Sequence, residues 1–406
     1  MDIIVQKYGG TSVATPESRC QVIEKISAAK KKGYAVVVVV SAMGRKGEPY
    51  ATDSLIGFVS EVNNELSSRE MDLLLSCGEI ISSVVLVGLL QSAGYKAISL
   101  TGAQAGIVTD GVYGSARIVR VKPDLVAQYL EEDYIVVVAG FQGASIEGEV
   151  TTLGRGGSDT TAAALGVALK AEVVEIYTDV NGLKTADPRI VDNTKTLDKV
   201  TYNEICQLAY EGARVIHPRA VEIAMQANIP IKIKSTFSEE PGTLVTSVVQ
   251  PYEETLIQSD RLITGITQIV GITQVCISTS QVGRSTFNQD LFLKLAEENI
   301  SIDFINVSLE QTIFTVPDSV ADRTLRVIEE FEAQASLRRN CAKVAAVGAG
   351  MTGVPGVMAR IVRALTRENI KILQSADSYT TIWCLVANQD MCKAVAALHQ
   401  EFGLGD

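Results

Sequence analysis

A lysine and an arginine beside clusters of glycines are the residues of this sequence best suited to bind anions. Lys7 precedes Gly9 and Gly10, and Arg155 lies between glycines in segment 154–158. Glycines let backbone N–H groups approach a phosphate closely, and a nearby lysine adds a point charge that suits a β- or γ-phosphate. An arginine fork fits a carboxylate or a phosphate. The sequence therefore predicts two anion-binding loops.

Each of these segments also has a purely structural interpretation. A GxxxxGK[ST] loop is absent, so the turn after Lys7 could be structural. The Ser-Asp pair at 158–159 could cap the alanine-rich helix that follows, although a cap does not explain an arginine flanked by three glycines. Glu79 lies where we expect a helix to start, and would gain from the helix dipole as an ordinary first-turn acid. The Asp-Pro-Arg turn at 187–189 could carry a plain surface arginine.

The elements that must position these residues alternate between apolar strands and amphipathic helices over about 235 residues. Continuous apolar runs are typical of parallel strands buried on both faces. The predicted strands are 3–5, 36–40, 97–100, 135–139, 173–178 and 231–233. A helix predicted from Glu17 to Lys32 would stop at Gly33. This rhythm indicates an α/β fold, a three-layer α/β/α sandwich with a mostly parallel central sheet and ligands at the carboxyl ends of its strands.

A second part of the chain begins after a polar stretch at 247–259. Leu-Ala-Glu-Glu-Asn-Ile at 295–300 and Leu-Thr-Arg-Glu-Asn-Ile at 365–370 match at four of six positions, 70 residues apart. Around each copy the order is strand, helix, strand, strand, helix, which indicates two ferredoxin-like α+β domains. We therefore expect a first domain at 1–246, a linker at 247–262, and two small domains at 263–335 and 336–406.

Composition excludes several classes of function. The formal net charge of −11 argues against nucleic-acid binding, because phosphate backbones are repelled. Seven scattered cysteines without a CxxC spacing and two distant histidines favour reduced thiols over a disulfide framework, a zinc site or a histidine-based triad. The N-terminus has no basic signal-peptide region, and the longest apolar stretch, around 80–90, is too short and interrupted to span a membrane. We expect a cytoplasmic protein.

Seven segments, taken together, resemble those of the aspartokinases of the amino-acid kinase superfamily. They are QKYGGTSV, VVVSAMG, SCGE, GFQG, TTLGRGGSDTTA, TDVNGLKTADPR and KSTFSEEPGTLV, in this order. The tail resembles paired ACT domains, above all in GAGMTGVPGV and QSADSYTTIW. The resemblance covers essentially the whole chain and implies an amino-acid kinase fold followed by two ACT domains. The length leaves no room for a fused homoserine dehydrogenase, so we expect the monofunctional form.

The resemblance implies transfer of the γ-phosphoryl group of MgATP to the β-carboxylate of L-aspartate, giving 4-phospho-L-aspartate, the first step towards diaminopimelate and lysine, threonine and methionine. Mg²⁺ would be held by ATP phosphates and water, without dedicated protein ligands. The residues expected to bind ATP are Lys7, Tyr8, Gly9, Gly10, Tyr177, Thr178, Asp179, Lys184 and Arg189. Lys7 would balance charge in the transition state, and Asp159 and Ser41 are the other expected catalytic residues.

For the acceptor, the resemblance assigns the α-carboxylate of aspartate to Arg155 and its α-ammonium group to Glu79. The residues expected to bind aspartate are Thr52, Glu79, Arg155, Gly156 and Ser158. A carboxylate is already ionised at pH 7, so the reaction needs no strong general base. It needs suppression of the repulsion between two anions and in-line positioning.

The ACT domains of this family pair into an extended sheet and bind amino acids at the interface, which implies a homodimer or a larger assembly. The expected effector site comprises Met351, Gly353, Val354, Pro355, Gly356, Gln374, Asp377 and Ser378. A plain turn with a surface acid is the alternative. SAMGRKGEPYATDS, GAGMTGVPGV and QSADSYTTIW resemble most the diaminopimelate-sensitive aspartokinase I subtype, which favours meso-diaminopimelate over lysine. Segment 280–285 departs from the expected D-x-P-G-like turn, which puts a threonine site there in question.

Two rival functions remain. One is another kinase of the superfamily, acting on glutamate or acetylglutamate, against which SCGE, GRGGSD and the ACT pair speak. The other is a catalytically silent amino-acid sensor, against which the intact Lys7, Glu79, Arg155 and Asp159 speak.

Overall fold

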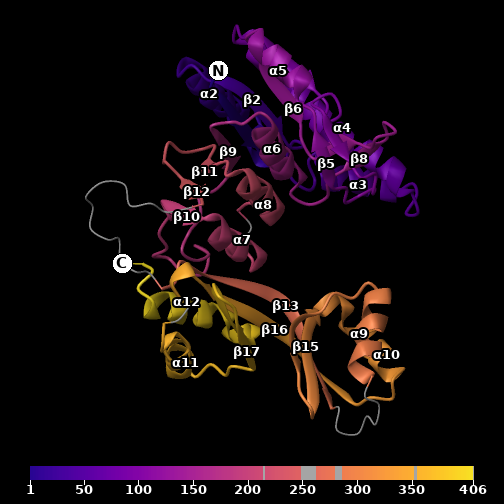
Figure 1. Ribbon diagram of the computed structural model, residues 1–406, viewed down its shortest axis with the longest axis vertical. Coiled ribbons are helices and arrows are strands. Elements are labelled where there is room, and N and C mark those ends of the chain that lie inside the picture. The colour runs from indigo at the N-terminus through magenta and orange to yellow at the C-terminus, as the bar shows by residue number, and fades with distance from the viewer. Residues whose placement is uncertain (214, 248–261, 279–285, 352–353, 406) are drawn as a thin grey trace. The chain divides into compact units, whose positions relative to one another are not determined.

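The computed structural model of the chain describes residues 1–213, 215–247, 262–278, 286–351 and 354–405 (Figure 1). These residues fall into two compact units, each built from more than one segment of the chain. Unit 1 comprises Met1–Leu183, Thr196–Tyr210 and Arg214–Thr255, and unit 2 comprises Lys184–Lys195, Glu211–Ala213 and Leu256–Asp406. The linker predicted at 247–262 lies, except for its two end residues, outside the described residues.

Two short segments that we expected in the first domain belong to unit 2, so the predicted domain boundaries need correction there. They are 184–195 and 211–213. Ala186 and Val191 are part of the hydrophobic core of unit 2, and the Thr267 hydroxyl donates a hydrogen bond of 2.7 Å to the carbonyl of Glu211. Because apolar packing and buried hydrogen bonds define a unit, a division by sequence order alone does not separate the two.

Unit 1 contains an eight-stranded, mostly parallel sheet, as predicted. Its order is β10 (Lys199–Thr201), β12 (Thr243–Thr246), β11 (Ile231–Ser235), β9 (Val173–Thr178), β1 (Ile3–Tyr8), β2 (Ala35–Val40), β6 (Ile135–Ala139) and β3 (Ala97–Leu100). Only the β11–β12 pair is antiparallel among these neighbours. A smaller sheet follows the order β5 (Ile118–Val121), β4 (Ile107–Thr109), β7 (Gln142–Ala144) and β8 (Val150–Thr152).

Helices cover both faces of the large sheet. The helices of unit 1 are α1 (Gly10–Val13), α2 (Pro16–Lys31), α3 (Thr52–Ser60), α4 (Ser68–Ser92), α5 (Asp124–Glu131), α6 (Gly157–Ala168), α7 (Tyr202–Tyr210) and α8 (Pro218–Ala227). Apolar residues of α2 and α4 pack on one face with alternate valines of β2, and α6 packs on β1, β2 and β9. All six residues of β2 are buried, as expected for a strand covered on both sides.

The helix that carries Glu79 starts earlier than the sequence indicated. We expected a helix start at Ser76, but α4 already begins at Ser68, so Glu79 is a mid-helix residue and not a first-turn acid. A capping hydrogen bond from the Glu70 N–H to the Ser67 side chain sets the start. By length and composition α4 would also be long enough to cross a membrane. However, Asp72 and Glu79 are buried on it and it packs against β3 and β6, as a core helix does.

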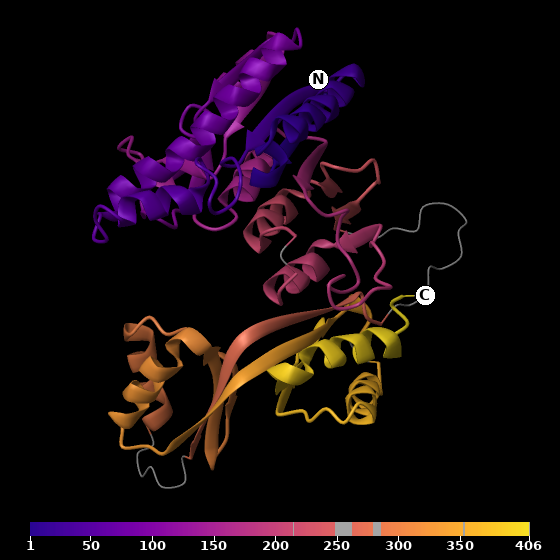
Figure 2. The ribbon, with the colours of Figure 1, turned by 180° about the vertical axis from the view of Figure 1, so that it is seen from behind.

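Unit 2 contains one six-stranded antiparallel sheet shared by two halves (Figure 2). Its order is β14 (Asp303–Val307), β15 (Gln311–Pro317), β13 (Gly265–Ser278), β16 (Ala335–Val347), β18 (Thr381–Ala387) and β17 (Gln374–Asp377). Four helices, α9 (Phe287–Glu297), α10 (Ala321–Glu329), α11 (Val357–Arg367) and α12 (Met391–Glu401), and three short 3₁₀ turns, Asp318–Val320, Ala349–Met351 and Asn388–Asp390, complete the described residues.

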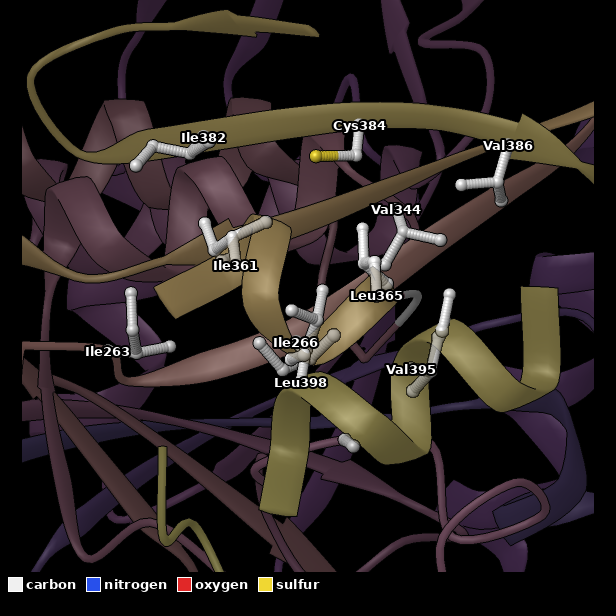
Figure 3. Packing of buried hydrophobic residues seen from close by; sticks show 14 of the residues in the cluster. Ile263, Ile266, Val344, Ile361, Leu365, Ile382, Cys384, Val386, Val395 and Leu398 are labelled. Carbon is white, nitrogen blue, oxygen red and sulfur yellow. The ribbon is translucent and has the colours of Figure 1, made fainter. Parts of the chain in front are cut away.

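The long strands β13 and β16 run through both halves. Ile263, just before β13, and Ile266 on it pack with α11, α12 and β18 in one core (Figure 3). Val275 and Ile277, further along β13, pack with α9 and α10 in another. The half that contains α9 and α10 is therefore inserted into the other half. The predicted division between 335 and 336 falls at the start of β16, which serves both cores.

The sequence repeat has a structural counterpart. Asn299 and Asn369 both adopt a left-handed backbone conformation, with φ of 52° and 58°. The next residue donates back to the helix in each copy, Ile300 to Leu295 and Ile370 to Leu365, both at 2.9 Å. The element orders β13–α9–β14–β15–α10 and β16–α11–β17–β18–α12 confirm two ferredoxin-like halves, in which these matching helix ends are equivalent.

Candidate active site

Lys7 and Asp159 form a partly shielded ion pair at the carboxyl end of the large sheet. The Lys7 Nζ lies 2.7 Å from Asp159 Oδ1, and each side chain is 11% exposed. Strand alternation aims Lys7 at the face that α6 covers, and Asp159 occupies the first turn of α6. The other carboxylate oxygen accepts a hydrogen bond of 3.2 Å from the backbone N–H of His217. The pair therefore joins β1 to the segment that contains Arg155.

Close backbone packing requires a glycine at position 10, in the turn after Lys7. A Cβ at Gly10 would come within 2.8 Å of the carbonyl oxygens of Ala42 and Gly44. Backbone hydrogen bonds fix the same arrangement, from Gly44 to Gly10 at 3.0 Å and from Gly9 to Tyr177 at 3.3 Å. The turns that follow β1, β2 and β9 are thus held together, which suits a ligand bound at the carboxyl ends of these strands.

Glu79 is a buried carboxylate with one satisfied oxygen. Its side chain projects from α4, and the residue is 2% exposed. One oxygen accepts from the backbone N–H of Ala42 at 3.0 Å, whereas the other has no hydrogen-bond partner among the described residues. Burial raises the pKa of Glu79 to about 8, although the bond from Ala42 lowers it in part. A buried oxygen without a partner is unfavourable unless a ligand supplies the donor.

The Arg155 loop is braced from α8. Gly156 has φ of 69°, and a Cβ there would come within 2.3 Å of the His217 side chain. Arg219 donates to the carbonyl oxygens of Leu153 and Ala116, at 3.0 and 2.8 Å. The guanidinium of Arg155 itself is exposed and forms no ion pair among the described residues. The loop is therefore rigid at its base and presents a free cation.

The other predicted residues of unit 1 lie on or next to several elements. Ser41 follows β2, and its backbone N–H donates to Tyr8 at 3.1 Å. Thr52 is the first residue of α3, and Ser158 is buried within α6. Asp179 forms an exposed ion pair with Arg45 at 2.6 Å and accepts from the Thr178 hydroxyl at 3.1 Å.

The side chains of two residues predicted to bind ATP point away from this region. The rings of Tyr8 and Tyr177 are buried and stacked, with centroids 4.8 Å apart. Both lie on the face packed against α2 and α4, opposite Lys7, and the Tyr177 hydroxyl donates to Glu175 at 2.9 Å. Burial raises the pKa of both phenols. Their side chains therefore do not line the region around Lys7.

Lys184 and Arg189 belong to unit 2, whereas Asp179 belongs to unit 1. The side chain of Arg189 is 86% exposed and donates twice to Asp187, at 2.7 and 3.0 Å. This local fork matches the turn-with-surface-arginine interpretation of Asp-Pro-Arg.

Some of the predicted effector residues are buried or engaged in contacts, and others are exposed. Met351 packs in the core of unit 2, and the Gln374 side chain is engaged with Gln274 and the carbonyl of Phe304, at 2.9 and 2.6 Å. The exposed members are Val354, Pro355, Gly356, Asp377 and Ser378. Gly353 and the segment 280–285 lie outside the described residues.

Comparisons with known proteins assign the family. Residues 2–235 match the model of the amino acid kinase family, and residues 336–400 match an ACT domain model. Aspartokinase 1 of Bacillus subtilis is 51% identical over 407 residues, which covers all of both chains. The chain belongs to the aspartokinase family. E. coli aspartokinase III, solved with aspartate and ADP, shares its fold at a TM-score of 0.80 and 26% identity, covering 98% of this chain and 99% of that one. The same enzyme solved with lysine and aspartate gives 0.75 and 25%, covering 98% and 99%.

The sequence does not reveal that His217 and Arg219 support the Arg155 loop. The sequence predicts no metal site or triad at His217, and the structure gives it a supporting role: it packs on Gly156 and caps α8 through Nδ1, which accepts from the Arg219 N–H at 3.3 Å. Burial lowers its pKa. The His-Pro pair was the available signal, since proline favours the first turn of a helix. Among the described residues no group of three or more metal-binding side chains was found.

Proposed function

We propose that the chain transfers the γ-phosphoryl group of MgATP to the β-carboxylate of L-aspartate, giving ADP and 4-phospho-L-aspartate. An oxygen of the β-carboxylate forms the new bond to phosphorus, while the bond to the bridging oxygen breaks and its electron pair leaves with ADP. No proton moves in this step. The protein must therefore neutralise charge and align the two reactants.

The observation that carries this proposal is the unpartnered oxygen of Glu79. It is buried, and an α-ammonium group is the donor that would satisfy it and stabilise the ionised carboxylate. Arg155 is the free cation for the α-carboxylate, with its bidentate fork. Gly156, Ser158 and Thr52 complete the proposed acceptor site.

On the nucleotide side, we assign Lys7, Gly9 and Gly10 to the phosphates. Asp159 holds the Lys7 ammonium at the end of β1, where it would offset charge that develops during transfer. Ser41 would lie beside the transferring group, and Thr178 and Asp179 beside the nucleotide. The roles of Tyr8 and Tyr177, through their backbones, and of Lys184 and Arg189 stay predictions.

Mg²⁺ fits this site as an ion carried by the nucleotide. Asp159 is paired with Lys7 and Asp179 with Arg45. The ligands of the ion would therefore be phosphate oxygens and water. Bound in that way, the ion would withdraw charge from the phosphates, while the residues of this chain position the reactants.

We further propose that an amino acid binds the ACT half and inhibits the enzyme, meso-diaminopimelate being favoured over lysine. The exposed Asp377 would meet an ammonium group, and the backbone before α11, around Gly356, would meet a carboxylate. We also propose a cytoplasmic homodimer or larger assembly, formed through the ACT domains. The seven cysteines, all within the described residues, are free thiols, as suits a reducing compartment.

A hydroxamate assay with MgATP tests the function. L-aspartate should give product, whereas L-glutamate and acetylglutamate should give little. Product that forms with glutamate in preference to aspartate would overturn the acceptor assignment, and no product with any acceptor would favour the silent sensor. Repeating the assay with lysine, threonine and meso-diaminopimelate identifies the effector.

A further inference from the structure

We propose that Asp72 is the positioning residue that fixes the geometry between Glu79 and the Arg155 loop, and so sets where the β-carboxylate of the acceptor points. This inference rests on the acceptor-binding roles proposed above. Asp72 itself does not touch the substrate. It acts through the elements to which it is bonded.

Asp72 is a buried carboxylate satisfied wholly by neutral donors. It is 1% exposed and accepts from the Thr152 backbone N–H at 2.7 Å, the Thr152 hydroxyl at 2.8 Å and the Gly114 N–H at 2.9 Å. It forms no ion pair among the described residues. An ionised carboxylate is costly to bury without a counter-charge, so all three donors are needed to hold it there. Such a fully used acceptor fixes its neighbours in one arrangement.

We call Asp72 with its hydrogen-bond donors Gly114 and Thr152 the clamp. One element that the clamp holds is α4, the helix that carries Glu79. Asp72 and Glu79 are seven residues apart on α4, which places them on the same face, two turns and about 10 Å apart along the axis. The position of α4 relative to Asp72 therefore determines where the free oxygen of Glu79 lies.

The other element that the clamp holds is β8, the strand that leads into the Arg155 loop. Thr152 ends β8, three residues before Arg155. Gly114 belongs to the same clamp, and its carbonyl oxygen would lie only 3.2 Å from a Cβ at Gly154. Asp72 thus holds both the strand before the loop and the backbone against which the loop packs.

A second hydrogen bond between α4 and the small sheet keeps the helix from rotating relative to that sheet. The Gln142 side chain, 3% exposed on β7, donates to the carbonyl of Ser76 at 2.9 Å. Since β7 pairs with β8, the helix is bonded to the small sheet at two points, one of them a single turn from Glu79. Glu79, proposed to bind the α-ammonium group, and Arg155, proposed to bind the α-carboxylate, therefore extend from elements that are held in one rigid assembly.

This assembly has a consequence for acceptor choice. Holding both substituents of the α-carbon fixes the direction of the side chain, and only the aspartate length would place its carboxylate in line with the phosphoryl group. Loosening the clamp should weaken aspartate binding and relax discrimination against L-glutamate and D-aspartate. Nucleotide binding should change little, because the hydrogen bonds to Asp72 come from Gly114 and Thr152 and not from Lys7, Gly9 or Gly10.

The test is a graded series in the full-length protein. Asp72→Asn replaces an acceptor by an amide that faces N–H donors, and should raise KM for aspartate about tenfold while KM for ATP stays within about twofold. Thr152→Val removes one hydroxyl donor and should raise KM for aspartate about threefold, whereas Thr152→Ser keeps the hydroxyl and should restore the parent value. In Asp72→Asn the ratio of kcat/KM for L-aspartate over L-glutamate should fall.

Asp110→Asn is the matched control. Asp110 also accepts two backbone N–H bonds, from Val112 and Arg117, in the same region but at the surface, so its replacement should leave both KM values unchanged. If Asp72→Asn does not fold, the Thr152 pair decides. Equal losses for ATP and aspartate, or no difference between Thr152→Val and Thr152→Ser, would overturn the proposal. Failure of Glu79→Gln to affect aspartate would instead overturn the proposed acceptor site.

Discussion

Lys7 and Asp159 meet as an ion pair of 2.7 Å between the end of β1 and the first turn of α6. Asp159 also accepts a hydrogen bond from the His217 N–H, so the pair links the segments that we propose to bind the nucleotide and the acceptor. Asp159→Asn keeps the acceptor for His217 but removes the charge that holds the lysine. We expect kcat to fall by about 100-fold with KM for aspartate nearly unchanged, measured by coupled ADP release.

Lys30 and Asp133 provide the control for that substitution. They form a lysine–aspartate pair of the same length, 2.7 Å, but Asp133 is 80% exposed and lies outside the site. Asp133→Asn should leave kcat unchanged, because an exposed pair contributes little. Equal effects of the two substitutions would contradict a specific role for Asp159.

Aspartate binding should release a proton near neutral pH. Burial raises the pKa of Glu79 to about 8, so the free enzyme holds this carboxyl protonated at pH 7, and an ammonium ligand favours the ionised form. KM for aspartate should therefore fall as the pH rises from 6 to 8, by up to about tenfold per unit. Calorimetry in buffers of different ionisation enthalpy measures the proton directly. Glu79→Gln should bind weakly and without this pH dependence, and an unchanged pH profile would refute the assignment.

A buried lysine should stabilise unit 2. The ammonium of Lys343 lies 3.0 Å from Glu211 and 2.7 Å from Asp303, with only 6% of the side chain exposed. Burial lowers its pKa, but Asp303 and Glu211 together outweigh this and raise it. Lys343→Met would leave Glu211 buried without a counter-charge, at a cost of about 3 kcal/mol or more in the free energy of unfolding.

Lys294→Met is the comparison in the same unit. Lys294 pairs with Glu297 and Glu298 at the surface, at 3.8 and 3.9 Å, so its loss should cost less than about 1 kcal/mol. Urea unfolding of both variants separates the two cases, and similar midpoints would contradict the role of Lys343.

Feedback inhibition should depend on Asp377 without a change in catalysis. Asp377 is exposed at the end of β17, so Asp377→Ala should leave kcat and the melting temperature near the parent values. The inhibitor concentration for half-maximal effect should rise about tenfold or more, as expected for loss of a charged hydrogen bond. Unchanged inhibition would remove Asp377 from the effector site.

Most strands and the two-part organisation could be predicted from sequence because their signals are local. Continuous apolar runs such as that of β2 identify buried parallel strands, and the asparagine at each repeat marks a left-handed helix end. The predicted start of α4 is wrong because Ser76 and Gly78 suggest a helix boundary, whereas the capping residue Ser67 lies nine residues before Ser76.

What the sequence could not provide was long-range pairing. Nothing local distinguishes Asp72 from a surface acid, since its donors come from Gly114 and Thr152. Adjacent residues of a strand point to opposite faces, so strand alternation predicts that the side chains of Lys7 and Tyr8 cannot both face one site. The QKYGGTSV motif nevertheless placed both residues in the predicted ATP site. The inclusion of 184–195 in unit 2 likewise depends on packing that only the fold reveals.

Paired steady-state kinetics of Lys7→Ala and Arg155→Ala, with ATP and aspartate each varied, test the central claim most directly. Lys7→Ala should lower kcat by about 1,000-fold, because charge in the transition state loses its partner, while KM for aspartate changes little. Arg155→Ala should raise KM for aspartate by about 100-fold and leave KM for ATP near the parent value. Near-normal kinetics of both variants, or identical losses for the two substrates in each, would contradict a site in which Lys7 serves the phosphates and Arg155 the acceptor.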